Sequence, residues 1–196
     1  MISGENLNQI LEARFNEHIT TASKTLVECK NQIIEVANTL TETLKSGKKI
    51  LICGNGGSAA DAQHFAAELV SSFSKDIKRR GLPAIALTTD SSILTAFSND
   101  FGFEGVFARQ VNALGSDGDC LVALSTSGNS KNCLLALEEA KSKKMKAISF
   151  LGQGGKMKNQ SDYSICIPSA NTQNIQEMHI VAYHIISELI ENNLFK

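Results

Sequence analysis

The sequence predicts an α/β fold: a doubly wound, flavodoxin-like sheet of five parallel strands, flanked by helices and preceded by a helical N-terminal extension. From Lys48 onward, short apolar runs alternate with helix-length segments. The runs are apolar on both faces, as parallel strands are when helices cover both sides of a sheet. The residues before Lys48 lack such runs and carry apolar side chains at helical spacing. We therefore assign residues 1–47 to the extension and residues 48–196 to one sheet domain.

The extension predicts two helices. Its apolar residues form two stripes at steps of three and four, from Leu7 to Phe15 and from Leu26 to Leu44, and Gly47 is a typical helix stop. Two such helices cannot bury their apolar faces alone. We therefore expect the extension to pack on the sheet domain and on another subunit, and so to serve in oligomerisation.

The elements of the sheet domain follow in order along the chain. Short apolar runs predict strands at 50–53, 84–87, 120–124, 147–150 and 163–167. Helical periodicity predicts helices at 58–73, 91–97, 103–114, 130–143 and 175–193.

Composition argues against several classes of function. A net charge of −1 gives no electrostatic argument for binding nucleic acid or an anionic membrane. No run of 18 apolar residues predicts a membrane span, and residues 1–6 lack the features of a signal peptide. The five cysteines include no Cys-x-x-Cys pair. This favours a reducing cytoplasm over a disulfide framework or a thiolate metal site.

Polar loops follow three of the predicted elements at the edge where ligands bind in such sheets. They are the glycine turn (residues 54–58), the pair Asn99 and Asp100, and the serine loop (residues 125–130). The serine loop offers four hydroxyls before a helix, from Ser125, Thr126, Ser127 and Ser130. Capping by Ser130 or Asn129 would explain only part of this, so the loop predicts a phosphate site. The glycine turn matches neither the G-x-G-x-x-G fingerprint nor a P-loop, so we expect no nucleotide cofactor.

His64 and Glu68 share one face of the helix predicted at 58–73, because they are four residues apart. Such a pair is more often an ordinary surface pair than a reactive one. The last predicted helix places Gln176 and His184 roughly on one side, and His179 competes with His184 for any role. His18 is expected on the surface of the extension.

Together these motifs resemble the phosphoheptose isomerase family of the sugar isomerase (SIS) domain superfamily, over nearly the whole chain. The resemblance rests on Cys53-Gly54-Asn55-Gly56-Gly57-Ser58, Gln63-His64-Phe65-Ala66-Ala67-Glu68, Asn99-Asp100-Phe101-Gly102-Phe103, the serine loop, and Ile175-Gln176-Glu177-Met178-His179 with His184. The serine loop is shared across the superfamily, whereas the set of His64, Glu68, Gln176 and His184 is specific to the isomerases.

The resemblance implies a SIS fold for residues 48–196 and a cytoplasmic homotetramer with active sites at subunit interfaces. It implies conversion of sedoheptulose 7-phosphate to D-glycero-D-manno-heptose 7-phosphate through an enediol, in the synthesis of ADP-heptose and the lipopolysaccharide core. The implied acid/base pair is Glu68 and His184, and the implied zinc ligands, one ion per subunit, are His64, Glu68, Gln176 and His184. The implied substrate contacts are Asn55, Gly56, Gly57, Ser58, Glu68, Asn99, Asp100, Ser125, Thr126, Ser127, Ser130 and Gln176.

Two departures leave alternatives open. The isomerases often carry an arginine one turn after the glutamate, where this chain has Ser72, and Arg79 or Arg80 is a candidate replacement. The stretches 58–60 and 83–90 look like the DnaA initiator-associating proteins, a non-enzymatic SIS branch. A scaffold has no need of Glu68 and His184, so their presence favours the isomerase. A regulatory SIS domain that senses a sugar phosphate is a third alternative, although such domains are usually attached to a DNA-binding module.

Overall fold

The computed structural model describes residues 4–196. Residues 1–3, which belong to the segment 1–6 that lacks the features of a signal peptide, lie outside the described residues. The strands are β1 (Ile50–Gly54), β2 (Ala84–Ala86), β3 (Cys120–Ser125), β4 (Lys146–Leu151) and β5 (Tyr163–Cys166). The helices are α1 (Gly4–Lys45), α2 (Gly57–Val70), α3 (Ser91–Phe101), α4 (Val106–Leu114), α5 (Lys131–Ser142), α6 (Lys156–Gln160) and α7 (Thr172–Phe195), and the 3-10 helix η1 (Phe103–Gly105) precedes α4.

The five strands form one parallel sheet in the order β2-β1-β3-β4-β5, which confirms the predicted fold class. All residues of β1 and β3 are buried, as expected for apolar runs covered on both faces. Gly54 at the end of β1 pairs with Leu124, one residue before the end of β3. The glycine turn and the serine loop therefore leave neighbouring strands at the same edge. The strand order reverses between β1 and β3, where ligands bind in doubly wound folds.

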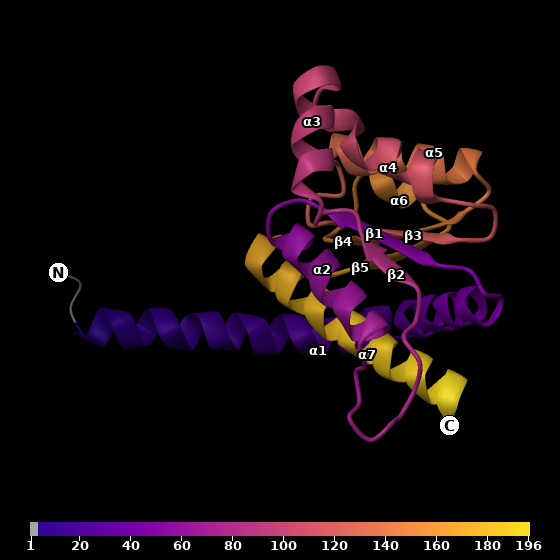
Figure 1. The fold of residues 1–196 in the computed structure, drawn as a ribbon. Coiled ribbons are helices and arrows are strands. Elements are labelled where there is room, and N and C mark those ends of the chain that lie inside the picture. The colour runs from indigo at the N-terminus through magenta and orange to yellow at the C-terminus, as the bar shows by residue number, and fades with distance from the viewer. Residues whose placement is uncertain (1–3) are drawn as a thin grey trace.

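Helices cover both faces of the sheet (Figure 1). On one face, α1, α2 and α7 enclose a core with β1, β3, β4 and β5. On the other face, α4, α5 and α6 enclose a second core, and the short helix α3 stands beside α4. The turn before α2, the loop before α5 and the start of α7 lie at the carboxyl edge of the strands.

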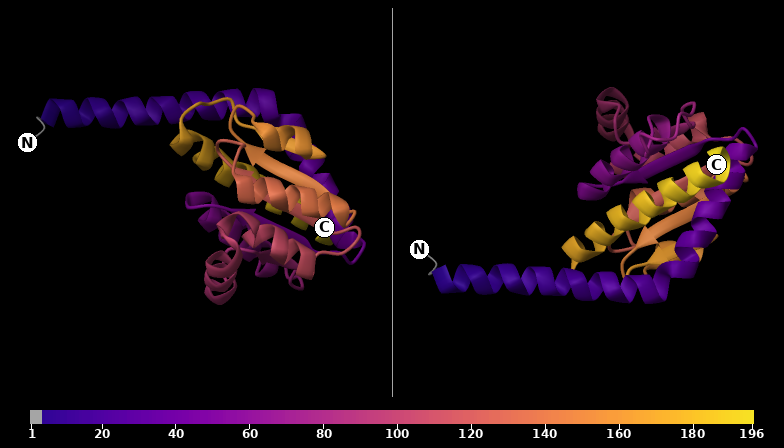
Figure 2. Two further views of the ribbon diagram at one scale, coloured as in Figure 1. Left: turned by 90° about the horizontal axis from the view of Figure 1, so that it is seen from above. Right: turned by 90° about the horizontal axis from the view of Figure 1, so that it is seen from below.

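The prediction of two helices in the extension is wrong, because α1 is a single helix of 42 residues. Neither glycine nor proline lies between Gly4 and Gly47, so nothing in the sequence ends the helix between the two apolar stripes. The halves of α1 run in different directions, and the first projects beyond the sheet domain (Figure 2). One face of the second half is buried, with Val36 and Leu40 in the same core as the sheet.

Other differences from the predicted elements are small. The helix α2 ends at Val70 instead of residue 73, and α7 begins at Thr172 because the side chain of Asn171 caps it. The helix α6 was not predicted, because it has a single turn and one buried residue, Met157. Within the described residues, no helix combines the length and the apolar character needed to cross a membrane.

Candidate active site

The glycine turn carries the chain from β1 directly into α2. Gly56 has a φ of +56°, a left-handed conformation that favours glycine. A Cβ atom at Gly57 would lie 2.0 Å from Nε2 of Gln176, so a larger residue here would displace the Gln176 side chain. Gly57 therefore leaves room for that side chain beside the start of α2.

The side chain of Asn55 connects the glycine turn to α5. Its Nδ2 donates to Oδ1 of Asn132 over 2.9 Å, and Nδ2 of Asn132 donates back to Oδ1 of Asn55 over 2.8 Å. This reciprocal amide pair ties together the loops that follow β1 and β3. Asn132 was not predicted as a site residue, because nothing in the local pattern distinguishes it from any polar residue near a helix start.

Three hydroxyls of the serine loop converge. Oγ of Ser125 lies 2.9 Å from Oγ of Ser130 and 3.4 Å from Oγ of Ser127. Ser130 is the N-cap residue of α5, yet its side chain makes no capping hydrogen bond. Capping by Ser130 therefore does not account for this hydroxyl cluster. The cluster lies at the N-terminus of α5, where unpaired backbone N–H groups attract anions.

A cavity of about 500 Å³ opens beside the serine loop, between the loops after β3 and β4 and the start of α7. Its lining is mainly small and polar and consists of Thr126, Ser127, Gln153, Gly154, Gly155, Ser169, Ala170, Thr172 and Ile175. Gln153, Gly154 and Gly155 were not predicted as site residues. A sequence pattern could have indicated them, since a glycine-rich segment follows β4 at the same edge of the sheet.

His64, Glu68 and His184 form a cluster between α2 and α7, which we call the histidine–glutamate cluster. Nε2 of His64 lies 2.9 Å from Oε1 of Glu68 and 3.5 Å from Nε2 of His184. The side chain of His64 is 46% exposed and that of Glu68 is 20% exposed, so the cluster is open to solvent. All three residues come from one chain.

The cluster forms because α2 and α7 pack side by side and run in the same direction. Gly57 contacts Gln176 near the start of both helices, and His64 contacts His184 further along. Burial lowers the pKa of His184, the positive charge of His64 lowers it further, and the negative charge of Glu68 opposes both. His184 is thereby favoured as the neutral imidazole, which can accept a proton.

Tyr183 is a buried member of this site that the sequence analysis missed. Its hydroxyl lies 2.9 Å from Nδ1 of His64. Burial, together with the negative charges of Asp61 and Glu68, raises the pKa of Tyr183 above its ordinary value, so the hydroxyl keeps its proton. In sequence Tyr183 is indistinguishable from an ordinary core aromatic.

Gln176 lies on the glycine side of the cluster, against Gly57 and Asp61. Burial raises the pKa of Asp61 to about 6, although the contact with Gln176 and the charge of His64 act in the opposite direction. Asp61 precedes His64 by three residues on α2, so the two share a helix face. The structure thus brings Gln176 to the same helix pair as the cluster.

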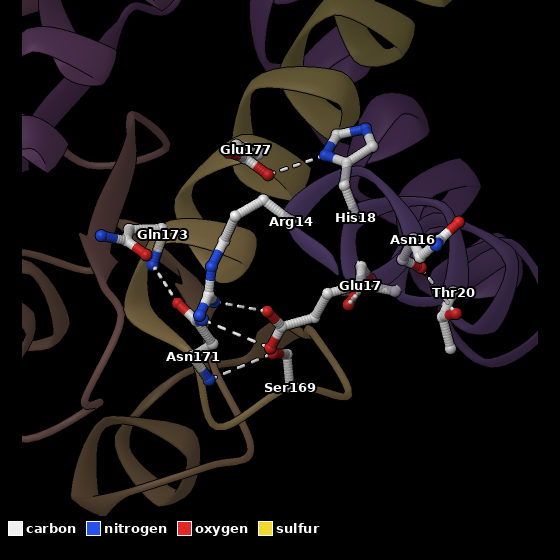
Figure 3. Close-up of polar contacts among 10 residues, drawn as sticks. Arg14, Asn16, Glu17, His18, Thr20, Ser169, Asn171, Gln173 and Glu177 are labelled. Carbon is white, nitrogen blue, oxygen red and sulfur yellow. Dashed lines mark hydrogen bonds and ion pairs between the residues drawn. The ribbon is translucent and has the colours of Figure 1, made fainter. Parts of the chain in front are cut away.

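Hydrogen bonds hold the start of α7 in place (Figure 3). Oδ1 of Asn171 accepts from the backbone N–H of Gln173 over 3.0 Å, and the N–H of Asn171 donates to Oγ of Ser169 over 3.1 Å. Nδ2 of Asn171 donates to Oε1 of Glu17 on α1 over 3.3 Å. Because Gln176 lies one turn into α7, α1 and this capping segment position it.

Asn99 and Asp100 lie apart from the rest of the predicted site in this chain. Both are exposed on α3, and Nδ2 of Asn99 donates to Oδ1 of Asp100 over 2.9 Å. The helix α3 stands at the outer side of the fold, away from α7 (Figure 1).

Arg79 does not offer its guanidinium to the histidine–glutamate cluster in place of an arginine at Ser72. Its side chain is buried, and Nε donates to Oε1 of Glu191 over 2.6 Å. Its Nη2 donates to the backbone carbonyl of Glu68 over 2.8 Å, so it holds the end of α2 instead. Arg80 is exposed on the same loop.

The remaining two histidines lie outside the cluster. His179 is wholly buried, and Nε2 donates to the carbonyl of Leu151 over 3.1 Å. Burial lowers the pKa of His179 to about 4, so it is a neutral core residue rather than a rival of His184. His18 lies on the surface of α1 as expected, with Nδ1 2.7 Å from Oε2 of Glu177 (Figure 3).

The histidine–glutamate cluster has the geometry of a metal site. One ligand atom from each of His64, Glu68 and His184 lies within 4.8 Å of the others. Two imidazole nitrogens and a carboxylate oxygen suit a borderline divalent cation. The residues present therefore fit a metal ion.

The fold and the clustered hydroxyls at its carboxyl edge define the class of protein, a SIS domain. The family model described as "SIS domain" matches residues 14–152.

Similar proteins identify the family within the SIS domains to which the chain belongs. The chain is 49% identical over 188 residues to the phosphoheptose isomerase of Helicobacter pylori strain P12, covering 95% of this chain and 97% of that protein. It is 51% identical over 184 residues to the phosphoheptose isomerase of Nitratiruptor sp., covering 93% of this chain and 97% of that protein. The structure of phosphoheptose isomerase from Neisseria gonorrhoeae superposes with a TM-score of 0.90 at 40% identity, covering 95% of this chain and 99% of that one. The chain belongs to the phosphoheptose isomerase family.

Proposed function

We propose that this chain converts sedoheptulose 7-phosphate to D-glycero-D-manno-heptose 7-phosphate through an enediol. The observation that carries the proposal is that the histidine–glutamate cluster lies between α2 and α7, and that α2 starts from the glycine turn at the same edge of the sheet as the serine loop. A reactive group and a phosphate-binding group are what a sugar-phosphate isomerase needs at one site. Membership of the phosphoheptose isomerase family supports the choice of substrate.

The reaction moves one proton between C1 and C2 of the sugar and redistributes protons on the two oxygens. We assign these transfers to Glu68 and His184, which face each other from α2 and α7 across His64. Glu68 acts as the base toward carbon. His184, favoured as the neutral imidazole, accepts and returns a proton at oxygen.

The serine loop binds the phosphate in this proposal. The convergence of Ser125, Ser127 and Ser130 supports it, as does the adjacent cavity that Thr126 and Ser127 line. Backbone N–H groups at the start of α5 add donors without a cationic side chain. The proposed contacts to the rest of the substrate are Asn55, Gly56, Gly57, Ser58, Glu68, Gln176, Asn99 and Asp100. Asn99 and Asp100 lie on α3, away from α7, so the packing of α2 and α7 does not position them.

We further propose zinc as the metal, one ion per subunit. His64, Glu68 and His184 would hold it, with the amide oxygen of Gln176 as the weakest ligand. A bound zinc ion supplies Lewis-acid polarisation of a carbonyl and stabilisation of an enediolate.

A cytoplasmic homotetramer is the proposed assembly, with a role in ADP-heptose and lipopolysaccharide core synthesis. The first apolar stripe of α1 supports oligomerisation, because Leu11 is 58% exposed and Phe15 is 63% exposed. A row of exposed apolar residues on a projecting helix is typical of a surface that another subunit covers.

The alternative of a non-enzymatic, initiator-binding SIS protein is less well supported. A scaffold does not require His64, Glu68 and His184 to meet within ligand distance. The phosphoheptose isomerase relatives, at about half identity over nearly the full length, also favour the enzyme.

An NMR assay with sedoheptulose 7-phosphate tests the proposal. The full-length protein is assayed after removal of metal and again after addition of zinc, and we expect the heptose 7-phosphate product with the zinc-loaded protein. Glu68→Gln is the inactive control. The absence of product from the wild-type protein under both conditions would overturn the isomerase and favour the scaffold.

A further inference from the structure

Tyr183 connects the hydrophobic core to the histidine–glutamate cluster. Its side chain is 0% exposed, and its ring stacks on Phe65 with a centroid distance of 5.3 Å and an interplanar angle of 17°. It meets the rings of His64 and His184 edge-on, at centroid distances of 5.4 and 5.0 Å. Packing on these sides holds the ring in one place, so its hydroxyl is a fixed point in the site.

The hydroxyl of Tyr183 selects one orientation of the His64 imidazole. It lies 2.9 Å from Nδ1, while Nε2 on the opposite side of the ring faces Glu68 and His184. A half-turn of the imidazole about its Cβ–Cγ bond would place Cδ2 where Nδ1 lies and Cε1 where Nε2 lies, and would so remove Nε2 from its position beside Glu68 and His184. His64 is half-exposed, so its orientation depends on its hydrogen bonds with Tyr183 at Nδ1 and with Glu68 at Nε2, and loss of the hydroxyl would remove one of the two.

A phenol suits this position because its hydroxyl both donates and accepts hydrogen bonds. When Nε2 of His64 carries the proton and donates to Glu68, Nδ1 is an acceptor and the hydroxyl of Tyr183 donates to it. When Nε2 gives its lone pair to a cation, Nδ1 carries the proton and donates a hydrogen bond to the oxygen of the same hydroxyl. Tyr183 can therefore stabilise His64 in both states without moving.

We propose that Tyr183 is a positioning residue that holds His64 with Nε2 directed at Glu68 and His184, and thereby strengthens the binding of a divalent cation by the cluster. The cation part rests on the metal site of the proposed function. Orienting hydrogen bonds to metal-binding imidazoles typically contribute about 10–100-fold in metal affinity. The adjacent residue His184 belongs to the cluster itself, so two neighbouring residues of α7 supply one ligand and the orientation of another.

Tyr183→Phe tests the proposal, because it keeps the ring on Phe65 and removes only the hydroxyl. Tyr163→Phe is the matched control, since Tyr163 is the only other tyrosine and lies on β5 against the same core. The zinc dissociation constant of each metal-stripped protein is measured by competition with a chromophoric chelator. We expect Tyr183→Phe to bind zinc at least about tenfold more weakly than wild type, and Tyr163→Phe to match wild type. Equal affinities of wild type and Tyr183→Phe would overturn the proposal.

Crystal structures of the metal-free wild type and of Tyr183→Phe give a second readout that does not depend on zinc. We expect one orientation of His64 in the wild type, and a rotated or split imidazole in the variant. If the wild type binds no zinc, the metal part of the proposed function fails, and the crystal structures alone decide the positioning role. An unchanged His64 in the variant would then overturn it. So would a Tyr183 hydroxyl that points away from His64 in the wild type, even if the variant fails to fold.

Discussion

Arg79 and Glu191 form a buried ion pair that joins the loop after α2 to the end of α7. Nε of Arg79 lies 2.6 Å from Oε1 of Glu191, and the two side chains are 0% and 1% exposed. Glu191 also accepts from the backbone N–H groups of Phe73 and Ser74, at 2.8 and 2.9 Å. Burial alone would raise the pKa of Glu191, but these hydrogen bonds and the charge of Arg79 lower it. The pair therefore holds the end of α2, just past Glu68, against α7.

Replacing Arg79 by Met should destabilise the protein strongly, because it leaves the charge of Glu191 buried without its partner. Breaking such a pair costs about 3–5 kcal/mol in the free energy of unfolding. Urea unfolding at pH 7 and fixed protein concentration measures this. The control Arg80→Met changes an exposed arginine on the same loop and should shift the free energy by no more than about 0.5 kcal/mol. Equal effects of the two substitutions would contradict the assignment.

His179 should make stability depend on pH. Its pKa falls from 6.5 to about 4 on folding, so its contribution is complete above pH 6.5 and is lost as the pH falls toward 4. The free energy of unfolding at pH 5 should therefore be about 2 kcal/mol lower than at pH 7. We expect His179→Gln to remove this part of the pH dependence and His18→Gln to retain it. Urea unfolding curves at pH 7 and pH 5 measure the loss of stability in each protein. An equal loss in wild type and in His179→Gln would contradict the role of His179.

Glu68→Gln should abolish isomerisation of sedoheptulose 7-phosphate, because an amide cannot take a proton from carbon. Fold and assembly should be unchanged, as measured by circular dichroism and light scattering. Glu188→Gln, on the exposed surface of α7, is the control that should keep wild-type turnover. Normal turnover by Glu68→Gln would end its assignment as the base.

Substituting Ser127 and Ser130 together by Ala should weaken phosphosugar binding. A hydrogen bond to a charged group contributes about 1.5–3 kcal/mol, so we expect at least about a tenfold loss of affinity. Isothermal titration calorimetry measures it in the Glu68→Gln background, where no turnover is expected. Ser142→Ala at the far end of α5 is the control. Unchanged affinity of the double variant would exclude the serine loop as the phosphate site.

Charged substitutions on the first half of α1 should dissociate the proposed tetramer. Leu11→Glu and Phe15→Glu place charges in the exposed apolar stripe, whereas Gln9→Glu alters a nearby exposed polar position. Light scattering should show smaller species for the first two and no change for the third. If all three keep one molecular mass, this stripe is not the subunit interface.

The sequence by itself determined the sheet, the helices around it and the loops at its carboxyl edge. These follow from local periodicity, because strands apolar on both faces and amphipathic helices leave short-range patterns. The spacing of His64 and Glu68 is local in the same sense. The continuity of α1 is not a local signal, because two apolar stripes fit either two helices or one helix whose halves have different surroundings.

Only the tertiary structure decided which side chains meet across the site. Tyr183 and His64 are 119 residues apart in sequence, Arg79 and Glu191 are 112 apart, and Asn55 and Asn132 are 77 apart. Each contact depends on the packing of α7 or α5 against the chain that follows β1, and helix packing is set by the whole core rather than by any segment. A buried tyrosine, a loop arginine and a helical asparagine have no distinctive local pattern. Their roles appear only when the folded chain brings their partners within hydrogen-bond distance.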